Sequence, residues 1–434
     1  MSKGYICFGT SRAPLFRHES FLPMRFLISL SDQALGALLT FIVNLWMARE
    51  GLPNSYGVYA LWLAVAWITG TAQSTLITCH LAGLNAVEKD ERAAAERFLL
   101  TIQILFALAA FVTTAVVMAV LGHYHSKFHA VGAVVFVPLF LVYQYTRALF
   151  FAHHQVGFAT ALTATSLLVF IVAASTCSLA GHAPTPDIGL LLAGGSYGSA
   201  ALAWLVIGTS GQRPLIHWRD MRPHLHYLHS SGWIMLGAAS AELTNRLFNF
   251  VGAWRYGPPA LAELTATQVV IRPAWMLNAA WSSISLPQLS RMWAHHDRHP
   301  FMKTLAAGLV LPLVGSILWT GSVALSWSEL SHLLYKGNYQ QSSSLILLWG
   351  ANVILGGLSA VGGTTLLSMK RYRVLALSDL AAALTTCSSM VIIAMNSHSS
   401  MVIVGTLAGQ TVQCLCMIYI IRRILAGSHM VSKK

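Results

Sequence analysis

The sequence predicts an all-α integral membrane protein with about twelve transmembrane helices in two six-helix halves. The first observation behind this prediction is composition: of 434 residues, 56% are hydrophobic and 9% are charged, whereas about 25% of residues are charged in soluble globular proteins. The second is a series of apolar segments that approach or exceed the roughly 20 residues needed to cross a bilayer. None of them alternates with the period of two that a membrane β-strand requires, so each is expected to be a helix.

We expect the spans at about 26–47, 58–80, 98–121, 130–152, 160–180, 189–209, 231–254, 264–286, 304–327, 342–368, 375–396 and 401–421. The longest loop, 210–230, falls halfway along the chain. It is the natural connector between an N-terminal bundle, 26–209, and a C-terminal bundle, 231–421. An N-terminal segment, 1–25, and a tail, 422–434, complete the predicted organisation.

A repeated turn is the third observation that supports two related halves. An arginine, a glycine and a proline follow the first span at alternate positions, and the same three residue types follow the seventh span with the same spacing. The two copies are Arg49, Gly51 and Pro53, and Arg255, Gly257 and Pro259. Each copy forms the exit turn of its span, and the chain therefore looks built twice.

The distribution of basic residues predicts the orientation. Of the 27 Lys and Arg residues, 20 lie in the termini and the even-numbered loops, four lie in the odd-numbered loops and three lie inside spans. Cytoplasmic loops carry the excess of Lys and Arg, so both termini are expected in the cytoplasm. The same distribution accounts for most of the net charge of +13, and we therefore expect no nucleic-acid partner.

Ionisable residues inside the spans are the candidate functional residues, because each costs roughly 2.5–3.5 kcal/mol to insert and normally faces the bundle interior or a water-filled cavity. They are Asp32, Arg147, Glu242, Arg246, Arg272 and Asp379. Glu242 and Arg246 are four residues apart on one helix face and can pair with each other. That pair is either structural or part of a substrate site.

Arginines dominate the predicted site. With the topology above, Arg246 and Arg272 lie in the outer half of the membrane, and Arg49 and Arg255 lie at the same outer rim. Guanidinium groups bind phosphate oxygens in a bidentate manner, so a pyrophosphate-bearing or acidic sugar substrate is expected. Arg147 either joins this substrate-binding set or extends its side chain to the lipid headgroups.

The acidic residues are assigned a second role. Asp32 and Glu242 are expected to tune the arginine site or to couple it to an ion gradient, whereas Asp379 is either a third cavity acid or an interfacial residue at the start of the eleventh span. No metal site is predicted, because the histidines of the connector have no acidic or cysteine partners at a recognised spacing. The chain also lacks the GxxxxGK[ST] motif of ATP hydrolysis, and no external loop is long enough for a catalytic domain. Enzyme activity is not expected.

Four stretches carry a resemblance to a known family: SDQALGALLTFIVNLWMAREGLPNSYGVYAL (31–61), SLPQLSRM (285–292), LLYKGNYQQSSSLILLWG (333–350) and TTLLSMKRYRVLALSDL (364–380). In their order and spacing the chain resembles the Wzx-type polysaccharide and O-antigen flippases of the multidrug/oligosaccharidyl-lipid/polysaccharide (MOP) exporter superfamily, to which the MATE transporters also belong. The matched family positions include Ala48, Arg49, Tyr56, Gly57 and Pro287.

The resemblance implies two six-helix bundles around a V-shaped cavity that opens alternately to each side. It implies a substrate of undecaprenyl-pyrophosphate-linked oligosaccharide, moved from the cytoplasmic to the periplasmic leaflet for lipopolysaccharide or exopolysaccharide biosynthesis. Coupling to H⁺ or Na⁺ is implied, with no other cofactor, and polysaccharide polymerase or assembly proteins are the expected protein partners alongside membrane lipids.

Three alternatives remain at this stage. A multidrug cation exporter of the same fold is expected to have a cavity dominated by acidic residues, whereas arginines outnumber acids here. A polymerase or glycosyltransferase of glycan assembly is expected to elongate sugar polymers. A facilitator-superfamily transporter also has twelve helices in two halves, but its usual glycine-aspartate-arginine signature is missing from LNAVEKDERAAAERF (84–98).

Overall fold

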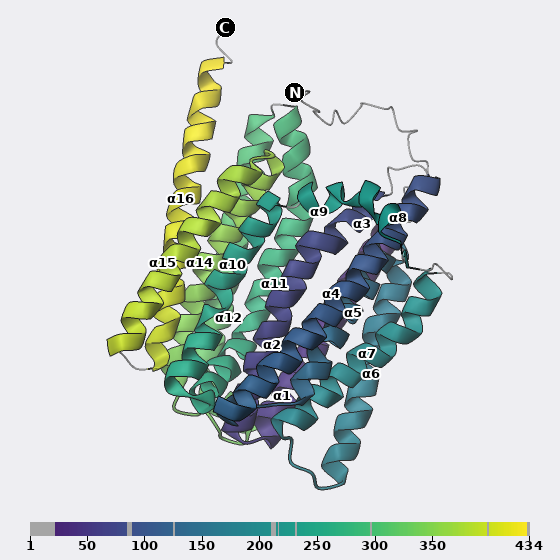
Figure 1. Ribbon diagram of the computed structural model, residues 1–434. Helices are drawn as coiled ribbons and strands as arrows, with labels where there is room; N and C mark the ends of the chain where they lie inside the picture. Colours follow the sequence, from purple (N-terminus) through teal and green to yellow (C-terminus); the bar gives the residue numbers. More distant parts are fainter. Residues whose placement is uncertain are drawn as a thin grey trace.

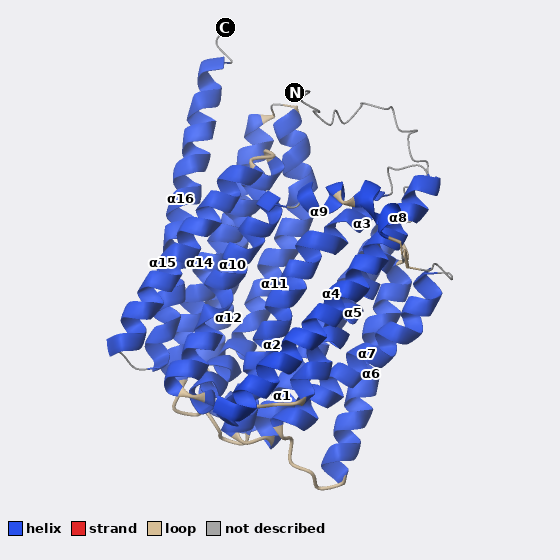
Figure 2. Cartoon of the chain, in the orientation of Figure 1, coloured by secondary structure: helices blue, strands red, loops and turns tan. Residues whose placement is uncertain are grey.

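The computed structural model describes residues 22–84, 89–124, 126–209, 214–215, 217–230, 232–295, 297–396 and 399–431. Within these residues the chain is helical and contains no β-strand (Figure 2). Residues 1–21 of the predicted N-terminal segment and residues 432–434 of the predicted tail lie outside the described residues. The all-helical fold class that the sequence predicts is confirmed.

The first half of the chain forms six long helical segments, here called the N-lobe. Their bounds are α1 (Leu22–Glu50), α2 (Pro53–Gln73) continued by the π-helix η1 (Ser74–Thr78) and α3 (Cys79–Gly83), α4 (Lys89–Tyr124), α5 (Gly132–Ala152), α6 (Val156–Leu179) and α7 (Pro186–Thr209). A short 3₁₀ turn, η3 (Ser126–Phe128), precedes α5.

The second half forms the C-lobe. Its bounds are α10 (Gly232–Val251) with the π-helix η5 (Gly252–Tyr256), α11 (Pro258–Ala294), α12 (Arg298–Leu325), α13 (Trp327–Tyr335), α14 (Ser343–Ser368), α15 (Tyr372–Asn396), η6 (Ser399–Met401) and α16 (Val402–Val431). Between the lobes lie α8 (Trp218–Met221), η4 (Arg222–His224) and α9 (His226–Ser230). The short helix α13 was not predicted, because its nine residues are too few to cross a membrane.

In the described part of the chain, nine helical segments are long and apolar enough to cross a membrane by length and composition. The helices α1, α10 and α11 fall outside this set, although they contain 29, 20 and 37 residues. They carry Asp32, the pair Glu242 and Arg246, and Arg272, respectively. With these three helices the described residues contain the twelve spans that the sequence predicts.

The bundle has two ends, which are named here by what lies at them. The connector end carries α3, α8 and α9 and the last turns of α16, at the top of Figure 1. The far end carries the turn between α1 and α2 and the turn between η5 and α11. An even number of crossings brings the start of α1 and the end of α16 to the same end, as the basic-residue distribution requires.

Helix packing divides the chain into two lobes that meet along α2. In the N-lobe, α5 packs against α7, and α1 packs against α6; in the C-lobe, α15 packs against α16 and α10, and α11 packs against α14. Between the lobes, α2 packs against α10 and α11. The helices α1, α2, α10 and α11 border the space between the lobes, and they carry four of the six ionisable residues predicted inside the spans.

A helix begins at the end of each copy of the repeated turn, several residues earlier than the sequence predicts. Helix α2 begins at Pro53, and α11 begins at Pro258 after Gly257, whose φ of 91° is accessible mainly to glycine. The two turns bring the first residues of α2 and α11 together at the far end. A Cβ atom added to Gly57 would lie 1.8 Å from the Pro258 carbonyl oxygen, so this backbone approach requires glycine.

Candidate functional site: an arginine-lined cavity between the lobes

A cavity of about 750 Å³ lies between the lobes, and its wall is formed by α1, α2, α5, α7, α10, α11 and α14. Most of its lining is apolar. Its charged lining residues are Arg147, Arg246, Arg272 and Glu242. The sequence grouped Arg246 and Arg272 in one site and left Arg147 and Glu242 with a structural alternative; the structure places all four in the wall of one cavity.

Arg147 is paired with Asp32. The guanidinium Nε donates to Asp32 Oδ2 at 2.9 Å, and Nη2 donates to the same oxygen at 2.5 Å. The Thr163 hydroxyl donates to Asp32 Oδ1 at 2.7 Å and lies 3.0 Å from the Tyr143 hydroxyl. The carboxylate is fully buried, whereas the arginine side chain is 26% exposed. The Arg147 side chain is therefore fixed inside the N-lobe and does not extend to the headgroups.

Arg246 and Glu242 form the intrahelical pair that their spacing predicts, with 2.5 Å between Nε and Oε2. Both side chains remain partly exposed to the cavity, at 21% and 23%. The guanidinium carbon of Arg246 also lies 5.2 Å from the centroid of the Trp67 ring, which comes from α2 of the other lobe. This geometry is a cation–π contact between the lobes.

Arg272 is the cavity cation without an acid partner among the described residues. Its hydrogen-bond acceptor is Gln268 Oε1, one turn earlier on α11, at 3.4 Å from Nη2. Arg246 is close enough to act on it electrostatically. Because Asp32 and Glu242 each neutralise one arginine, the cavity carries about one uncompensated positive charge, at Arg272.

Arg49 and Arg255 do not join these arginines. Each lies at the far end and donates to a backbone carbonyl of the C-lobe: Arg49 Nη1 to Leu333 at 2.5 Å, and Arg255 Nε to Ala394 at 2.8 Å. Neither is a lining residue of the cavity. The sequence grouped them with Arg246 and Arg272 because the predicted topology puts all four in the outer half of the membrane or at its outer rim, but the structure separates the two at the rim from the two inside.

Asp379 lies within the C-lobe, away from the cavity lining. It is 7% exposed and accepts a hydrogen bond from Gln413 Nε2 at 2.6 Å. The interfacial interpretation of this residue and its role as a cavity acid both remain predictions.

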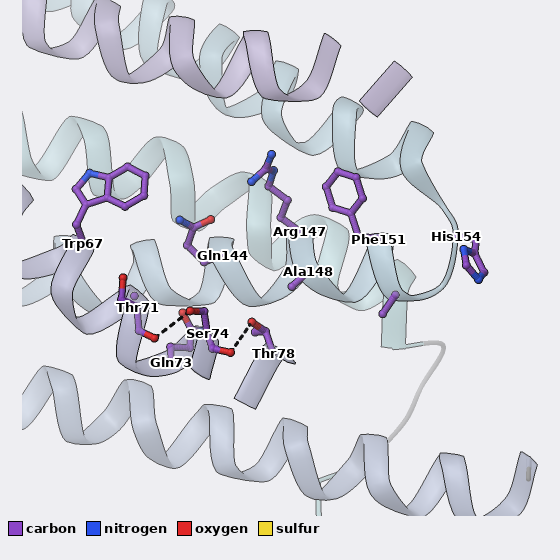
Figure 3. A pocket seen from close by; sticks show the side chains of 12 residues that line it. Trp67, Thr71, Gln73, Ser74, Thr78, Gln144, Arg147, Ala148, Phe151 and His154 are labelled. Carbon is purple, nitrogen blue, oxygen red and sulfur yellow. Dashed lines mark hydrogen bonds between the residues drawn. The ribbon is translucent and has the colours of Figure 1, made fainter. Parts of the chain in front are cut away.

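A second cavity, of about 630 Å³, extends from the first toward the connector end. It is bounded by α2, η1 and α5 and reaches His154, just beyond the end of α5 (Figure 3). Trp67, Gln144 and Arg147 line both cavities. Sequence reasoning missed Trp67, Gln144 and the hydroxyl-bearing residues of this region, although the run TGTAQSTLIT (69–78) is unusually polar for a membrane span.

The far end is closed. In addition to the contact of Gly57 with Pro258, the Glu50 carboxylate at the end of α1 lies 2.6 Å from Lys336 Nζ, just after α13. Arg49 bonds to Leu333 in the same place. The described residues thus form a cavity that reaches toward the connector end and close contacts between the lobes at the far end.

The described histidines and cysteines form no candidate metal site: among the described residues, no three His, Cys, Asp or Glu side chains are grouped to hold a metal ion. His224 and His226 of the connector instead pack against Tyr227, with ring centroids 6.4 Å and 4.1 Å apart.

Comparison with known proteins shows the fold. No family model matches the chain, and no curated protein sequence matches it. Among solved structures, an inward-facing multidrug resistance MATE family transporter of the MOP superfamily aligns with a TM-score of 0.73 at 10% identity, covering 92% of this chain and 98% of that one. The lipid II flippase MurJ in an inward closed conformation aligns with a TM-score of 0.70 at 10% identity, covering 92% and 87%.

An outward-facing MATE family transporter aligns less well, with a TM-score of 0.63 at 12% identity, covering 93% of this chain and 94% of that one. The chain thus has the two-lobed, twelve-helix fold of MOP-superfamily transporters, and the structures it resembles are transporters and not enzymes. At these identities the likeness concerns the fold alone.

Proposed function

We propose that this protein is a flippase that moves a lipid-linked oligosaccharide, carried on undecaprenyl pyrophosphate, across the bacterial inner membrane by alternating access. The observation that carries the proposal is Arg272, a cavity arginine with no acid partner among the described residues, beside two arginines whose charges are neutralised. A positive charge held in a largely apolar cavity favours a substrate that combines an anionic group with an apolar chain.

The chemistry of the three arginines supports a phosphate-bearing substrate. A guanidinium group offers two parallel N–H donors to a phosphate, and such charge-assisted bonds are roughly twice as strong as neutral ones. Among the described residues Arg272 makes one long hydrogen bond, so its remaining donors are available to a ligand. In a cationic-drug exporter the uncompensated charge is expected to be negative, and here both cavity-associated acids, Asp32 and Glu242, are paired with arginines.

The two ion pairs suggest how the site is coupled to an ion gradient. Protonation of Glu242 or of Asp32, or binding of Na⁺ to either, would release its arginine to the anionic substrate. In this proposal Asp32 and Glu242 are coupling residues, and Arg147 and Arg246 join Arg272 in substrate binding only in one step of the cycle. Arg49 and Arg255 act at the far end, where the substrate leaves.

The conformation supports this direction of loading. The cavity extends to the connector end, the far end is closed, and the alignment is better with an inward-facing than with an outward-facing neighbour. With the connector and both termini in the cytoplasm, as the basic residues favour, the structure corresponds to the state that accepts substrate from the cytoplasmic leaflet. The product would then serve periplasmic polysaccharide assembly proteins.

The proposal is tested in a deletion strain complemented with wild type, Arg272→Ala, Arg272→Lys or the control Arg373→Ala. Arg373 is suitable because it lies over Trp233, 4.9 Å from the ring centroid, outside the cavity lining. We expect wild type and Arg373→Ala to restore surface glycan and to clear the lipid-linked intermediate, Arg272→Lys to do so partly, and Arg272→Ala to fail at equal protein level. Intact glycan in the deletion strain, with lost resistance to cationic drugs, would instead assign the protein to drug export.

A further inference from the structure

The second cavity differs chemically from the first. Seven of its twelve lining residues are polar or charged, and its two walls come from α2 with η1 and from α5, whereas the first cavity is mostly apolar (Figure 3). Its polar lining residues besides Arg147 are Thr71, Gln73, Ser74, Thr78, Gln144 and His154. Its volume of about 630 Å³ falls within the range of roughly 300–1,000 Å³ that is typical of small-molecule sites.

The hydroxyl groups of α2 and η1 form one stripe toward this cavity. Thr71, Ser74 and Thr78 are spaced by three and four residues, so they share a helix face. Ser74 Oγ donates to the Thr71 carbonyl at 2.9 Å, and Thr78 Oγ1 donates to the Ser74 carbonyl at 3.5 Å, which leaves both hydroxyl oxygens as acceptors. The π-helix η1 lies within this stripe, and single π-turns occur frequently at functional sites.

Two side chains in this cavity have unused hydrogen-bonding capacity. In the part of the chain that the structure describes, neither the Thr71 hydroxyl nor the Gln144 amide has a hydrogen-bond partner, although both line the cavity. The buried indole N–H of Trp67 also has no partner. By contrast, Gln73 is fully engaged inside the N-lobe, because its Nε2 donates to Gln103 at 2.6 Å and to the Leu141 carbonyl at 2.7 Å.

Each of the two helices that line the cavity contributes one aromatic ring, Trp67 from α2 and Phe151 from α5. The Arg147 guanidinium carbon lies 5.4 Å from the Phe151 ring centroid. Such rings offer an apolar face of the size of a sugar ring, while the hydroxyls of α2 and η1 and the Gln144 amide can bond to sugar hydroxyls. Arg147 is the one charged residue that lines this cavity, and Asp32 neutralises it. The chamber is therefore suited to a hydroxyl-rich, uncharged ligand.

We infer that this cavity binds the first, uncharged sugar residues of the carried glycan. The inference rests on the proposed function, because it assigns the sugar residues next to the pyrophosphate to the second cavity and the pyrophosphate itself to the first. Trp67, Gln144 and Arg147 line both cavities. A ligand that extends past these three residues therefore reaches from the second cavity to Arg272 in the first without leaving the protein. Thr71 and Gln144 then discriminate among glycans, and Arg272 recognises the group common to all of them.

The test compares two probes on the purified full-length protein: a prenyl diphosphate that carries one N-acetylhexosamine, and the bare prenyl diphosphate. The variants are Thr71→Val and Gln144→Leu, which keep the side-chain size and remove its hydrogen bonds. The matched control is Thr69→Val, on the same helix, whose hydroxyl donates to the Val65 carbonyl at 2.8 Å and does not line either cavity. Thermal unfolding confirms that each variant is folded.

For wild type we expect the glycosylated probe to bind at least fivefold more tightly than the bare one. Thr71→Val and Gln144→Leu should each raise the Kd of the glycosylated probe about three- to tenfold, as expected for one lost hydrogen bond, without changing the Kd of the bare probe. Thr69→Val should change neither.

Three outcomes are informative in different ways. Equal wild-type affinity for both probes would overturn the sugar subsite and leave the arginine site intact. Equal weakening of both probes by Thr71→Val and Gln144→Leu would also overturn it, because the cavity would then act on the shared part of the ligand. Binding of neither probe by wild type would refute the proposed function itself, and the sugar subsite with it.

Discussion

The guanidinium carbon of Arg246, on α10, lies 5.2 Å from the centroid of the Trp67 ring, on α2. The Arg246 side chain of the C-lobe thus packs on the Trp67 ring of the N-lobe, where the first and the second cavity meet. Any movement of the two lobes relative to each other changes this contact. The same contact orients Arg246, which Glu242 holds from the other side.

Replacing Trp67 with leucine should weaken transport by about 2- to 30-fold, because a cation–π contact contributes roughly 0.5–2 kcal/mol. Trp67→Phe should retain part of the activity, since it preserves an aromatic face. The control is Trp233→Leu, which removes the cation–π contact with Arg373. Initial transport rates in proteoliposomes provide the measurement, and equal rates for both leucine variants would contradict a special role for Trp67.

The far-end ion pair should bias the conformational equilibrium only slightly. Glu50 and Lys336 are 35% and 52% exposed, and exposed pairs contribute about 0–1 kcal/mol. Lys336→Glu should therefore increase the outward-open population by less than about tenfold, as measured by spin-label distances across the far end. The exchange variant Glu50→Lys/Lys336→Glu should return the distances to those of wild type; if it behaves like the single variant, the pair does not hold the lobes together.

Gly57→Ala should obstruct closure of the far end. The added Cβ would lie 1.8 Å from the Pro258 carbonyl oxygen, and the opposing atoms are backbone that cannot move aside easily. Overpacking of this kind costs about 1–3 kcal/mol, so we expect either a lower unfolding temperature or a shift to the outward-open state. Gly195→Ala is the matched control, since nothing lies within 4 Å of its added Cβ. Identical behaviour of the two variants would argue against close packing at Gly57.

The Asp32–Arg147 pair should show strong energetic coupling. Removing one partner of a buried ion pair costs about 3–5 kcal/mol, because the other charge stays buried without compensation. Asp32→Ala and Arg147→Leu should each be strongly destabilising, and the double variant should be more stable than either. Chemical unfolding of the purified protein supplies the double-mutant cycle. Additive effects would show that the two charges are solvated independently.

Much of the fold could be predicted from the sequence because lipid imposes strict demands on a chain. A span must satisfy its backbone groups internally and must be long enough to cross the hydrocarbon layer, so apolar length alone locates most helices. The helices α1, α10 and α11 are not apolar enough to be located in this way. They were still predicted, because each is an apolar run of spanning length that only a few charged residues, such as Asp32, Arg246 and Arg272, interrupt. The repeated turn indicated two related halves, although the predicted spans begin at 58 and 264 and the helices begin at Pro53 and Pro258.

Less of the candidate site could be predicted, because sequence spacing reports neighbours on one helix and not between helices. The Glu242–Arg246 pair follows from a spacing of four residues. The Asp32–Arg147 pair joins residues 115 positions apart and was not predicted. Thr71 and Gln144 were missed for a different reason: uncharged polar residues are cheap enough in a membrane helix that they do not stand out in composition.

The sequence by itself determined that this chain is a twelve-helix membrane protein of two related halves, with its excess charge on one side and arginines inside its spans. Only the tertiary structure decided which charges cancel. It pairs Arg147 and Arg246 with acids, removes Arg49 and Arg255 to the far end, and leaves Arg272 without an acid partner among the described residues. The physical reason is that net charge in a cavity depends on distances of a few ångströms between helices, which only the packing of α1, α5, α10 and α11 defines.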